Sequence, residues 1–326
     1  MATASEPHVP VLLDRVVELL ADAPAGVYLD GTLGAAGHAT AVLAARAERY
    51  GTASLVGIDR DPTALALAGD RLAELPDSVT RHLVEARFDA APAVLDDLGV
   101  DRVAAVLLDL GISSMHVDRA ERGFSYRQEG PLDMRMGPDA PRTAADVVNT
   151  YELRDLAGVI RRFGEEKFAD RVARAIVARR GIRPFELTTD LAEVVRDAIP
   201  QAARRTGGHP ATRTFQALRI EVNGELTALE AVLPALLERL APDGVMAVLA
   251  YHSLEDRIVK RAFADAASGC ICPPGFPVCA CGRVPLVEHV IRRPERPDEL
   301  EIVDNPRASA ARLRVVRRAA AAEDQA

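Results

Sequence analysis

The stretch VYLDGTLGAAGH, residues 27–38, decides the expected fold of this chain. Its first four residues are typical of a short buried strand, and residues 39–49 are typical of a helix. The glycines at 31, 34 and 37 allow positive φ angles and a close approach of the backbone to a ligand. The N–H groups at the start of the helix point back to the same place. A parallel α/β sheet binds a nucleotide-like cofactor in this way at the carboxyl end of its first strand.

The next strand ends in an acidic residue that supports this interpretation. SLVGI (54–58) leads into Asp59, which lies 22 residues after Gly37 and precedes a helix expected over 62–75. A nucleotide-binding α/β fold places there the acid that accepts the ribose hydroxyls. The glycine spacing is neither G-x-G-x-x-G nor that of a phosphate loop, so S-adenosylmethionine fits better than a dinucleotide. The alternative for Asp59 is a solvated loop carboxylate.

Composition and charge limit the class of protein. The 326 residues are 48% hydrophobic and 27% charged, without an apolar run near the roughly 18 residues of a membrane span. We therefore expect a cytoplasmic protein with no membrane partner. The net charge of −8 is unevenly distributed, because residues 1–118 contain 8 Lys/Arg and 18 Asp/Glu, whereas residues 151–219 contain 14 and 9. This local basic excess predicts an RNA-binding surface.

The order of the expected elements predicts two domains. Apolar segments typical of strands, each followed by a helix, lie at 27–30, 54–58, 79–85 and 102–108. The pattern then becomes helical, and we expect an all-α insertion over 118–215. The sheet resumes after a long helix (223–240) and a turn (241–244), with strands at 245–250, 287–291 and 313–316. The chain is thus expected to form a doubly wound α/β domain from residues 1–117 and 216–326.

One expected helix of the insertion carries part of the basic excess. A helix over 165–180 has an apolar stripe and places Lys167, Arg171 and Arg174 on one face, since they stand at i, i+4 and i+7. Further candidates for phosphate contacts are Arg204, Arg205, Arg213 and Arg219. For each arginine alone, a solvated surface side chain is the alternative.

The motifs resemble those of the small-subunit ribosomal RNA methyltransferase H family, also called MraW. The matching segments include DGTLGAAGH (30–38), LLDLGISS (107–114) and YHSLEDRIVKR (251–261), and they follow in order along nearly the whole chain. The resemblance implies a class I S-adenosylmethionine-dependent methyltransferase fold with an all-α insertion. It also implies methylation of N4 of a cytosine in 16S rRNA, cytosine 1402 of the decoding region.

The resemblance also implies a set of cofactor contacts. Carried over by position, they fall on Ala36, Gly37, His38, Asp59, Phe88, Asp109 and His116. Ala36 stands where glycine is usual, and we expect its contact to come from the backbone N–H. His116 stands where glutamine is usual. These departures keep two alternatives open, an RNA-binding ribosome assembly factor with a vestigial cofactor pocket and a methyltransferase of another substrate.

Methylation of a cytosine amine requires a hydrogen-bond acceptor, and we expect this acceptor at the end of the fourth strand. An exocyclic cytosine amine is a poor nucleophile, and a hydrogen-bond acceptor on one N–H both orients it and takes up its proton. Asp109 stands at the right place, and it contacts either the target amine or only the cofactor. Ser113 and Ser114 orient the base or cap the next helix. His252, after the fifth strand, is a further catalytic candidate, and Phe88 stacks on the adenine or packs in the core.

All four cysteines lie within twelve residues, at Cys270, Cys272, Cys279 and Cys281. A disulfide framework is not expected in a reducing cytoplasm. The cluster predicts either a structural zinc site or free thiols, because C-x-C spacing differs from the usual C-x₂-C. The sequence leaves the oligomeric state open, a homodimer included.

Overall fold

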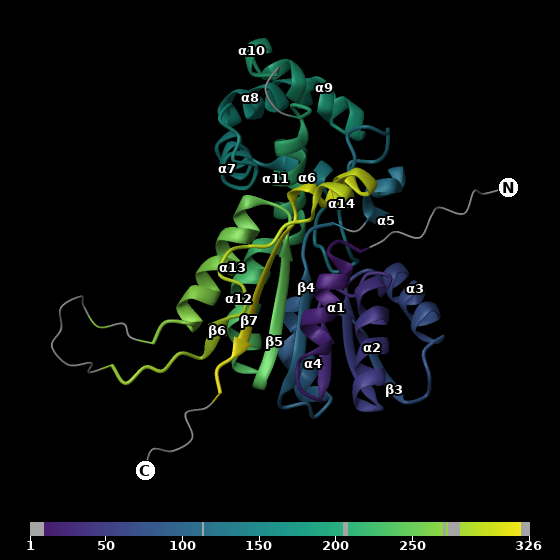
Figure 1. Cartoon of the computed structure of the whole chain (residues 1–326). Helices are drawn as coiled ribbons and strands as arrows, with labels where there is room; N and C mark the ends of the chain where they lie inside the picture. The colour runs from purple at the N-terminus through teal and green to yellow at the C-terminus, as the bar shows by residue number, and fades with distance from the viewer. Residues whose placement is uncertain (1–9, 113, 205–207, 270–271, 273–280, 321–326) are drawn as a thin grey trace. The chain divides into compact units, whose positions relative to one another are not determined.

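The computed structural model describes residues 10–112, 114–204, 208–269, 272 and 281–320. It divides into two compact units, which we call the sheet unit (Met1–Gly111 with Leu226–Ala326) and the helical unit (Ile112–Glu225) (Figure 1). The helical unit extends further at both ends than the 118–215 expected from the sequence.

The sheet unit contains a seven-stranded sheet in the order β3-β2-β1-β4-β5-β7-β6. Strands β1 to β5 are parallel, and β7 pairs antiparallel with β5 and with β6. The bounds are β1 Val27–Asp30, β2 Ala53–Asp59, β3 Val79–Glu85, β4 Val103–Asp109, β5 Leu240–Ala250, β6 Val287–His289 and β7 Arg312–Arg318. The order reverses between β1 and β4, and this is the doubly wound sheet of the class I methyltransferase fold that the sequence predicted.

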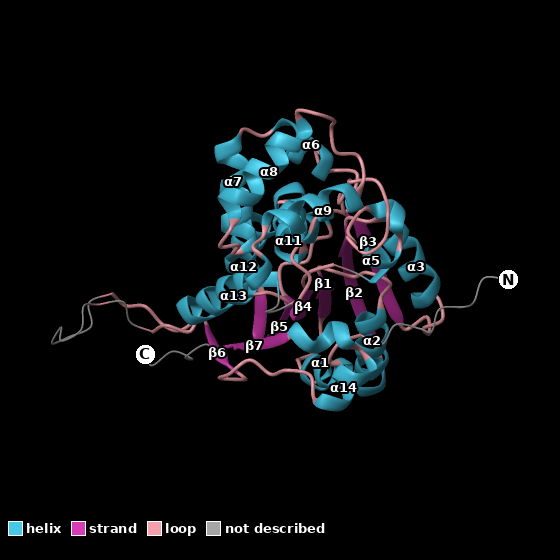
Figure 2. Ribbon diagram, turned by 90° about the horizontal axis from the view of Figure 1, so that it is seen from above, coloured by secondary structure: helices cyan, strands magenta, loops and turns pink. Residues whose placement is uncertain are grey.

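Helices cover both faces of this sheet because its strands are apolar on both sides (Figure 2). Leu107 packs in the core beneath α1 (Leu13–Ala21), α2 (Gly37–Tyr50) and α3 (Pro62–Leu72). Its neighbour Leu108 points to the other face, beneath α4 (Ala91–Asp97), α12 (Glu225–Glu238) and α13 (Ser253–Ala266). The remaining short elements of the unit are η1 Phe88–Ala90, α14 Glu299–Asp304 and η3 Pro306–Ala310.

Two details around β5 correct the sequence prediction. Residues 241–244, expected as a turn, lie inside β5 at a register shift, where Leu240 pairs with Val103 and Val245 pairs with Ala105. The expected long helix over 223–240 is the shorter α12, Glu225–Glu238, because Gly224 has a φ of 63° and ends α11 at Asn223.

The helical unit packs its helices around one apolar core. Its elements are α5 Ser114–Asp118, η2 Ala120–Arg122, α6 Ala144–Thr150, α7 Leu153–Gly164, α8 Ala169–Arg180, α9 Thr188–Ala198, α10 Gln201–Arg204 and α11 Thr212–Asn223. The predicted helix over 165–180 begins only at Ala169, because Glu165 adopts a φ of 48° and ends α7. Lys167 therefore precedes α8 and shares no helical face with Arg171 and Arg174.

Within the residues that the structure describes, no helix has the length and apolar character needed to cross a membrane.

Candidate active site

The glycine turn after β1 is held by its neighbouring strands. The N–H of Gly31 donates to the carbonyl of Leu107 in β4 (3.0 Å), and the N–H of Leu33 donates to that of Ile58 in β2 (2.9 Å). A Cβ on Gly31 would lie 2.6 Å from the side chain of Leu108, so no larger residue fits there without a shift. The turn is thereby fixed at the carboxyl ends of three adjacent strands.

Ala36 completes the turn in a backbone conformation that favours glycine. Its φ is 58°, its side chain is buried, and its N–H donates to the carbonyl of Leu33 (2.8 Å). The N–H that the sequence assigned to the cofactor is thus used within the turn itself. The next residue, Gly37, begins α2, and a Cβ there would lie 2.5 Å from the ring of Pro10.

Asp59 ends β2 and bonds to the turn. Its Oδ2 accepts from the N–H of Gly34 (2.7 Å), and its Oδ1 accepts from the N–H of Asp61 (2.9 Å). The half-buried carboxylate therefore orders the glycine turn, a role that the sequence did not reveal.

Asp109 ends β4 and is bonded on both its backbone and its side chain. Its N–H donates to Oγ1 of Thr32 (2.6 Å), and its Oδ1 accepts from the hydroxyl of Tyr251 (2.9 Å). Burial, and then the charge of Asp109, raises the pKa of the Tyr251 phenol well above its ordinary value. Tyr251 thus remains a hydrogen-bond donor at neutral pH. The other oxygen, Oδ2, lies 3.6 Å from Nε2 of His38, and the carboxylate side chain is 27% exposed.

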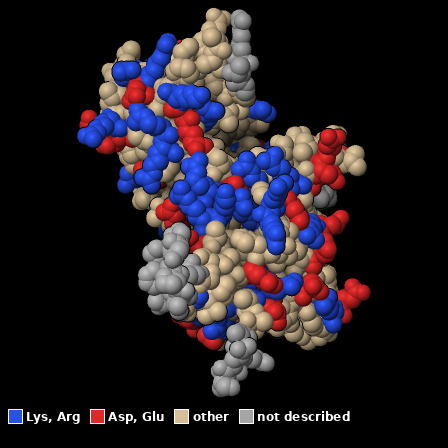
Figure 3. Space-filling view, turned by 60° about the vertical axis from the view of Figure 1, so that its left-hand side comes forward, with Lys and Arg blue, Asp and Glu red and all other residues tan. Residues whose placement is uncertain are grey.

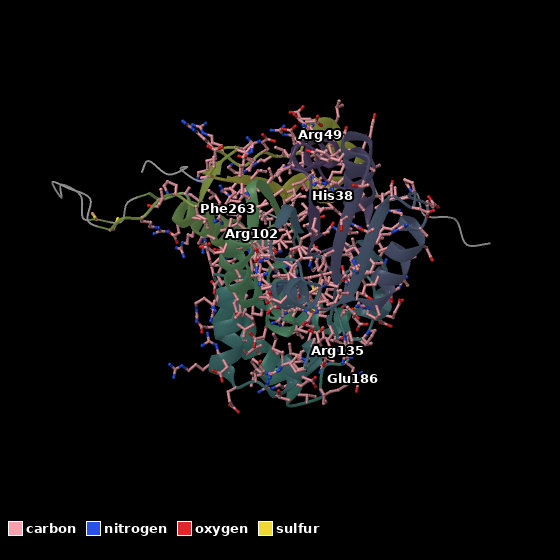
Figure 4. The ribbon with its side chains drawn as sticks, turned by 90° about the horizontal axis from the view of Figure 1, so that it is seen from below. His38, Arg49, Arg102, Arg135, Glu186 and Phe263 are labelled. Atoms are coloured by element: carbon pink, nitrogen blue, oxygen red, sulfur yellow. The ribbon has the colours of Figure 1, made fainter. Side chains whose placement is uncertain are left out.

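His38, on the first turn of α2, is the most telling side chain of this cluster (Figure 4). It is 6% exposed, and neither ring nitrogen has a hydrogen-bond partner in the part of the chain that the structure describes. A buried polar group without a partner requires an explanation, and one explanation is a ligand that supplies the missing bonds.

A second buried carboxylate lies beneath the turn. Asp30 is 1% exposed, accepts from the hydroxyl of Tyr28 (2.9 Å) and accepts from the N–H of Thr32 (3.1 Å). Burial raises the pKa of Asp30 to about 6, against the opposing effects of the Thr32 N–H and His38. The sequence did not mark Tyr28, Thr32 or Tyr251 as site residues, and Asp30 appeared only as the end of a strand.

The comparison with protein families shows the family of this chain. The model of the MraW methylase family matches residues 5–319. The chain belongs to this family. The curated relatives include the "Ribosomal RNA small subunit methyltransferase H" of Heliobacterium modesticaldum, 51% identical over 94% of this chain and 97% of the relative. The protein of the same name from Thermobifida fusca is 52% identical over 95% of this chain and 93% of the relative.

Among solved structures, an rRNA methylase from Streptococcus thermophilus matches 94% of this chain and 93% of its own, with a TM-score of 0.37 and 11% identity. A likeness this slight adds nothing to the MraW assignment, which the sequence relatives carry.

The other predicted site residues have different surroundings. Phe88 begins η1, is half-buried and packs against the core of the sheet unit. His252 caps the N-terminus of α13, where its Nδ1 accepts from the N–H of Glu255 (3.4 Å) and its own N–H donates to the Glu255 carboxylate (3.2 Å). His116 belongs to the helical unit, where it is buried with its ring 5.1 Å from that of Phe124.

Part of the predicted site lies outside the described residues, namely Ser113, Arg205, Cys270 and Cys279. Ser114 begins α5. Cys272 and Cys281 are both half-buried.

Proposed function

We propose that this protein transfers a methyl group from S-adenosylmethionine to N4 of a cytosine in 16S rRNA, cytosine 1402 by its resemblance to the MraW family. The observation that carries the proposal is the geometry of Asp109. Its carboxylate ends the strand beside the point where the sheet order reverses, and Tyr251 holds one of its oxygens.

The residues around the glycine turn fit the cofactor. Asp59, which ends β2 at the glycine turn, is our proposal for the acceptor of the ribose hydroxyls. His38 has two buried nitrogens that lack partners among the described residues. Bound there, S-adenosylmethionine would supply an electrophilic methyl group. Phe88 remains our proposal for the adenine contact. Gly37 and Ala36 contribute the shape of the turn, because the N–H of Ala36 is used within it.

Asp109 can supply the hydrogen-bond acceptor that the target amine needs. The nitrogen of an exocyclic cytosine amine becomes positively charged as it gains a methyl group and must then lose a proton. A carboxylate that accepts a hydrogen bond from the amine N–H orients the lone pair and receives that proton. Because Tyr251 occupies Oδ1, we assign Oδ2 to this contact. Ser113 and Ser114 remain proposals for orienting the base, and His252 positions the start of α13.

We propose that exposed arginines of the helical unit make the RNA contacts. Arg219 forms a bidentate pair with Glu225 and is 11% exposed, so it stabilises the fold rather than binding phosphate. Arg213 is exposed on α11, and Arg171 and Arg174 are exposed on α8. Figure 3 shows Lys and Arg side chains in groups on the visible surface, and local groups of this kind can attract RNA phosphates despite a net negative charge. A 16S rRNA substrate would place the protein in the cytoplasm.

One observation favours a second function. Ala36 replaces a glycine, and its N–H is unavailable to a cofactor, so the chain can instead be an RNA-binding assembly factor without turnover. The experiment that separates the two is methyl transfer from labelled S-adenosylmethionine to small ribosomal subunits that lack the modification. Label in the 16S rRNA supports the methyltransferase. Subunit binding without label supports the assembly factor.

A further inference from the structure

Three aromatic rings lead from the core of the helical unit to its surface. Phe215 of α11 is 4% exposed, and Tyr126 meets its ring edge-on, with centroids 5.6 Å apart and an angle of 82°. The imidazole of His209 stacks on Tyr126 at 4.5 Å and 14°. Tyr126 is half-buried and His209 is exposed, so the series ends in a ring at the surface.

The two outer rings are held in place by hydrogen bonds. The hydroxyl of Thr212 donates to the phenol oxygen of Tyr126 (3.1 Å), and the N–H of Ala211 donates to Nδ1 of His209 (3.2 Å). An Nδ1 that accepts leaves the proton of the neutral imidazole on Nε2. Burial, and then the charges of Arg196 and Arg127, lowers the pKa of His209. The ring is therefore an uncharged donor at neutral pH.

Two guanidinium groups accompany the rings. The guanidinium carbon of Arg127 lies 6.0 Å from the centre of Tyr126, and both Arg127 and Arg196 lie close enough to affect His209. Arg196 pairs with Asp197, with both side chains largely exposed. Arg127 is exposed and has no carboxylate partner within the described residues.

The hydrogen bond in the turn before α11 does not by itself require a histidine at position 209. An acceptor at position 209 suffices to bond the N–H of Ala211, and an asparagine provides one. The exposed ring, its stacking on an ordered tyrosine and the cations beside it together match a planar base attached to phosphate. We propose that Tyr126 and His209, with Arg127 beside them, form a stacking site for an unpaired base of an RNA strand. This inference rests on the proposed function, because it concerns the same rRNA substrate.

The test uses the full-length protein and a single-stranded oligoribonucleotide that contains 2-aminopurine, whose fluorescence is quenched when it stacks. An abasic oligonucleotide of equal length keeps the phosphates and serves as the reference. We expect the wild type to bind the base-containing strand about 5- to 100-fold more tightly than the abasic strand, with quenching. Tyr126→Leu and His209→Asn should lose both effects. Tyr126→Phe loses the hydrogen bond from Thr212 but keeps the ring and its edge-on contact with Phe215, so it should retain both the base-dependent affinity and the quenching.

His209→Asn retains the acceptor for the N–H of Ala211 at an exposed position, so it tests stacking without disturbing the turn. Equal affinity of wild type and His209→Asn for the base-containing strand, with equal quenching, would overturn the stacking site. So would wild-type affinity that is the same for the abasic strand. Methylation of small subunits by the wild type is measured in parallel. Methylation without a base-dependent affinity refutes the stacking site alone, whereas base-dependent affinity without methylation refutes the methyltransferase alone.

Discussion

Replacing Asp30 by asparagine should stabilise the sheet unit at neutral pH and flatten its pH dependence. Burial raises the pKa of Asp30 from 3.8 to about 6, so folding favours the protonated form. The stability that this preference gives is fully present below pH 4 and is lost as the pH rises through 6. A shift of that size corresponds to about 3 kcal/mol of unfolding free energy at pH 7 and above.

The variant can keep both partners of the carboxyl group, with the direction of the hydrogen bond to Tyr28 reversed. The amide oxygen of Asp30→Asn can accept from the N–H of Thr32, and its NH₂ can donate to the phenol oxygen of Tyr28. Because the amide does not ionise, we expect Asp30→Asn to be more stable than wild type by about 1–3 kcal/mol at pH 7.5 and by about a third of that difference at pH 4.5.

The assay is urea unfolding followed by circular dichroism at pH 4.5, 6.0 and 7.5, analysed for the transition of the sheet unit. The quantity compared is the difference between wild type and variant, since other carboxylates titrate equally in both. Asp77→Asn removes an exposed carboxylate from the same unit and should not reproduce the effect. A variant less stable than wild type at pH 7.5, or a difference in stability that does not depend on pH, would show that burial does not raise the pKa of Asp30.

Three further changes test the site. Asp59→Ala should weaken binding of S-adenosylmethionine by about 1–3 kcal/mol in calorimetry, because a charged acceptor is lost, and unchanged affinity would remove Asp59 from the cofactor site. Tyr251→Phe leaves Oδ1 of Asp109 without its donor and should lower turnover at saturating cofactor about tenfold. Equal turnover would dismiss Tyr251 as a positioning residue. If the four cysteines bind zinc, elemental analysis should find about one equivalent, whereas under half an equivalent with four titratable thiols would favour free cysteines.

The sequence predicted the parts of this structure that depend on local pattern. Apolar segments of strand length marked β1 to β4, and Asp59 and Asp109 end β2 and β4 as expected. The ends of helices were harder to predict. The apolar periodicity predicted one helix over 165–180, but Glu165 has a left-handed backbone conformation that ends α7, and this conformation cannot be read from the periodicity.

The hydrogen bonds within the site could not be predicted from the sequence. Tyr251 lies 142 residues from Asp109, and only the pairing of β4 with β5 brings them together. A tyrosine inside an apolar strand, such as Tyr28, is typical of a core residue, and its bond to Asp30 has no sequence signature. The use of the Ala36 N–H within the turn likewise depends on backbone geometry that residue types do not reveal.

The identity of the methylated nucleoside tests the proposed function most directly. Small ribosomal subunits that lack this modification are incubated with the purified protein and labelled S-adenosylmethionine, and the 16S rRNA is digested for mass spectrometry. We predict one N4-methylcytidine per subunit, and its loss when Asp109 is replaced by alanine. Label on another nucleoside, or no label in the presence of bound protein, would contradict the proposed function.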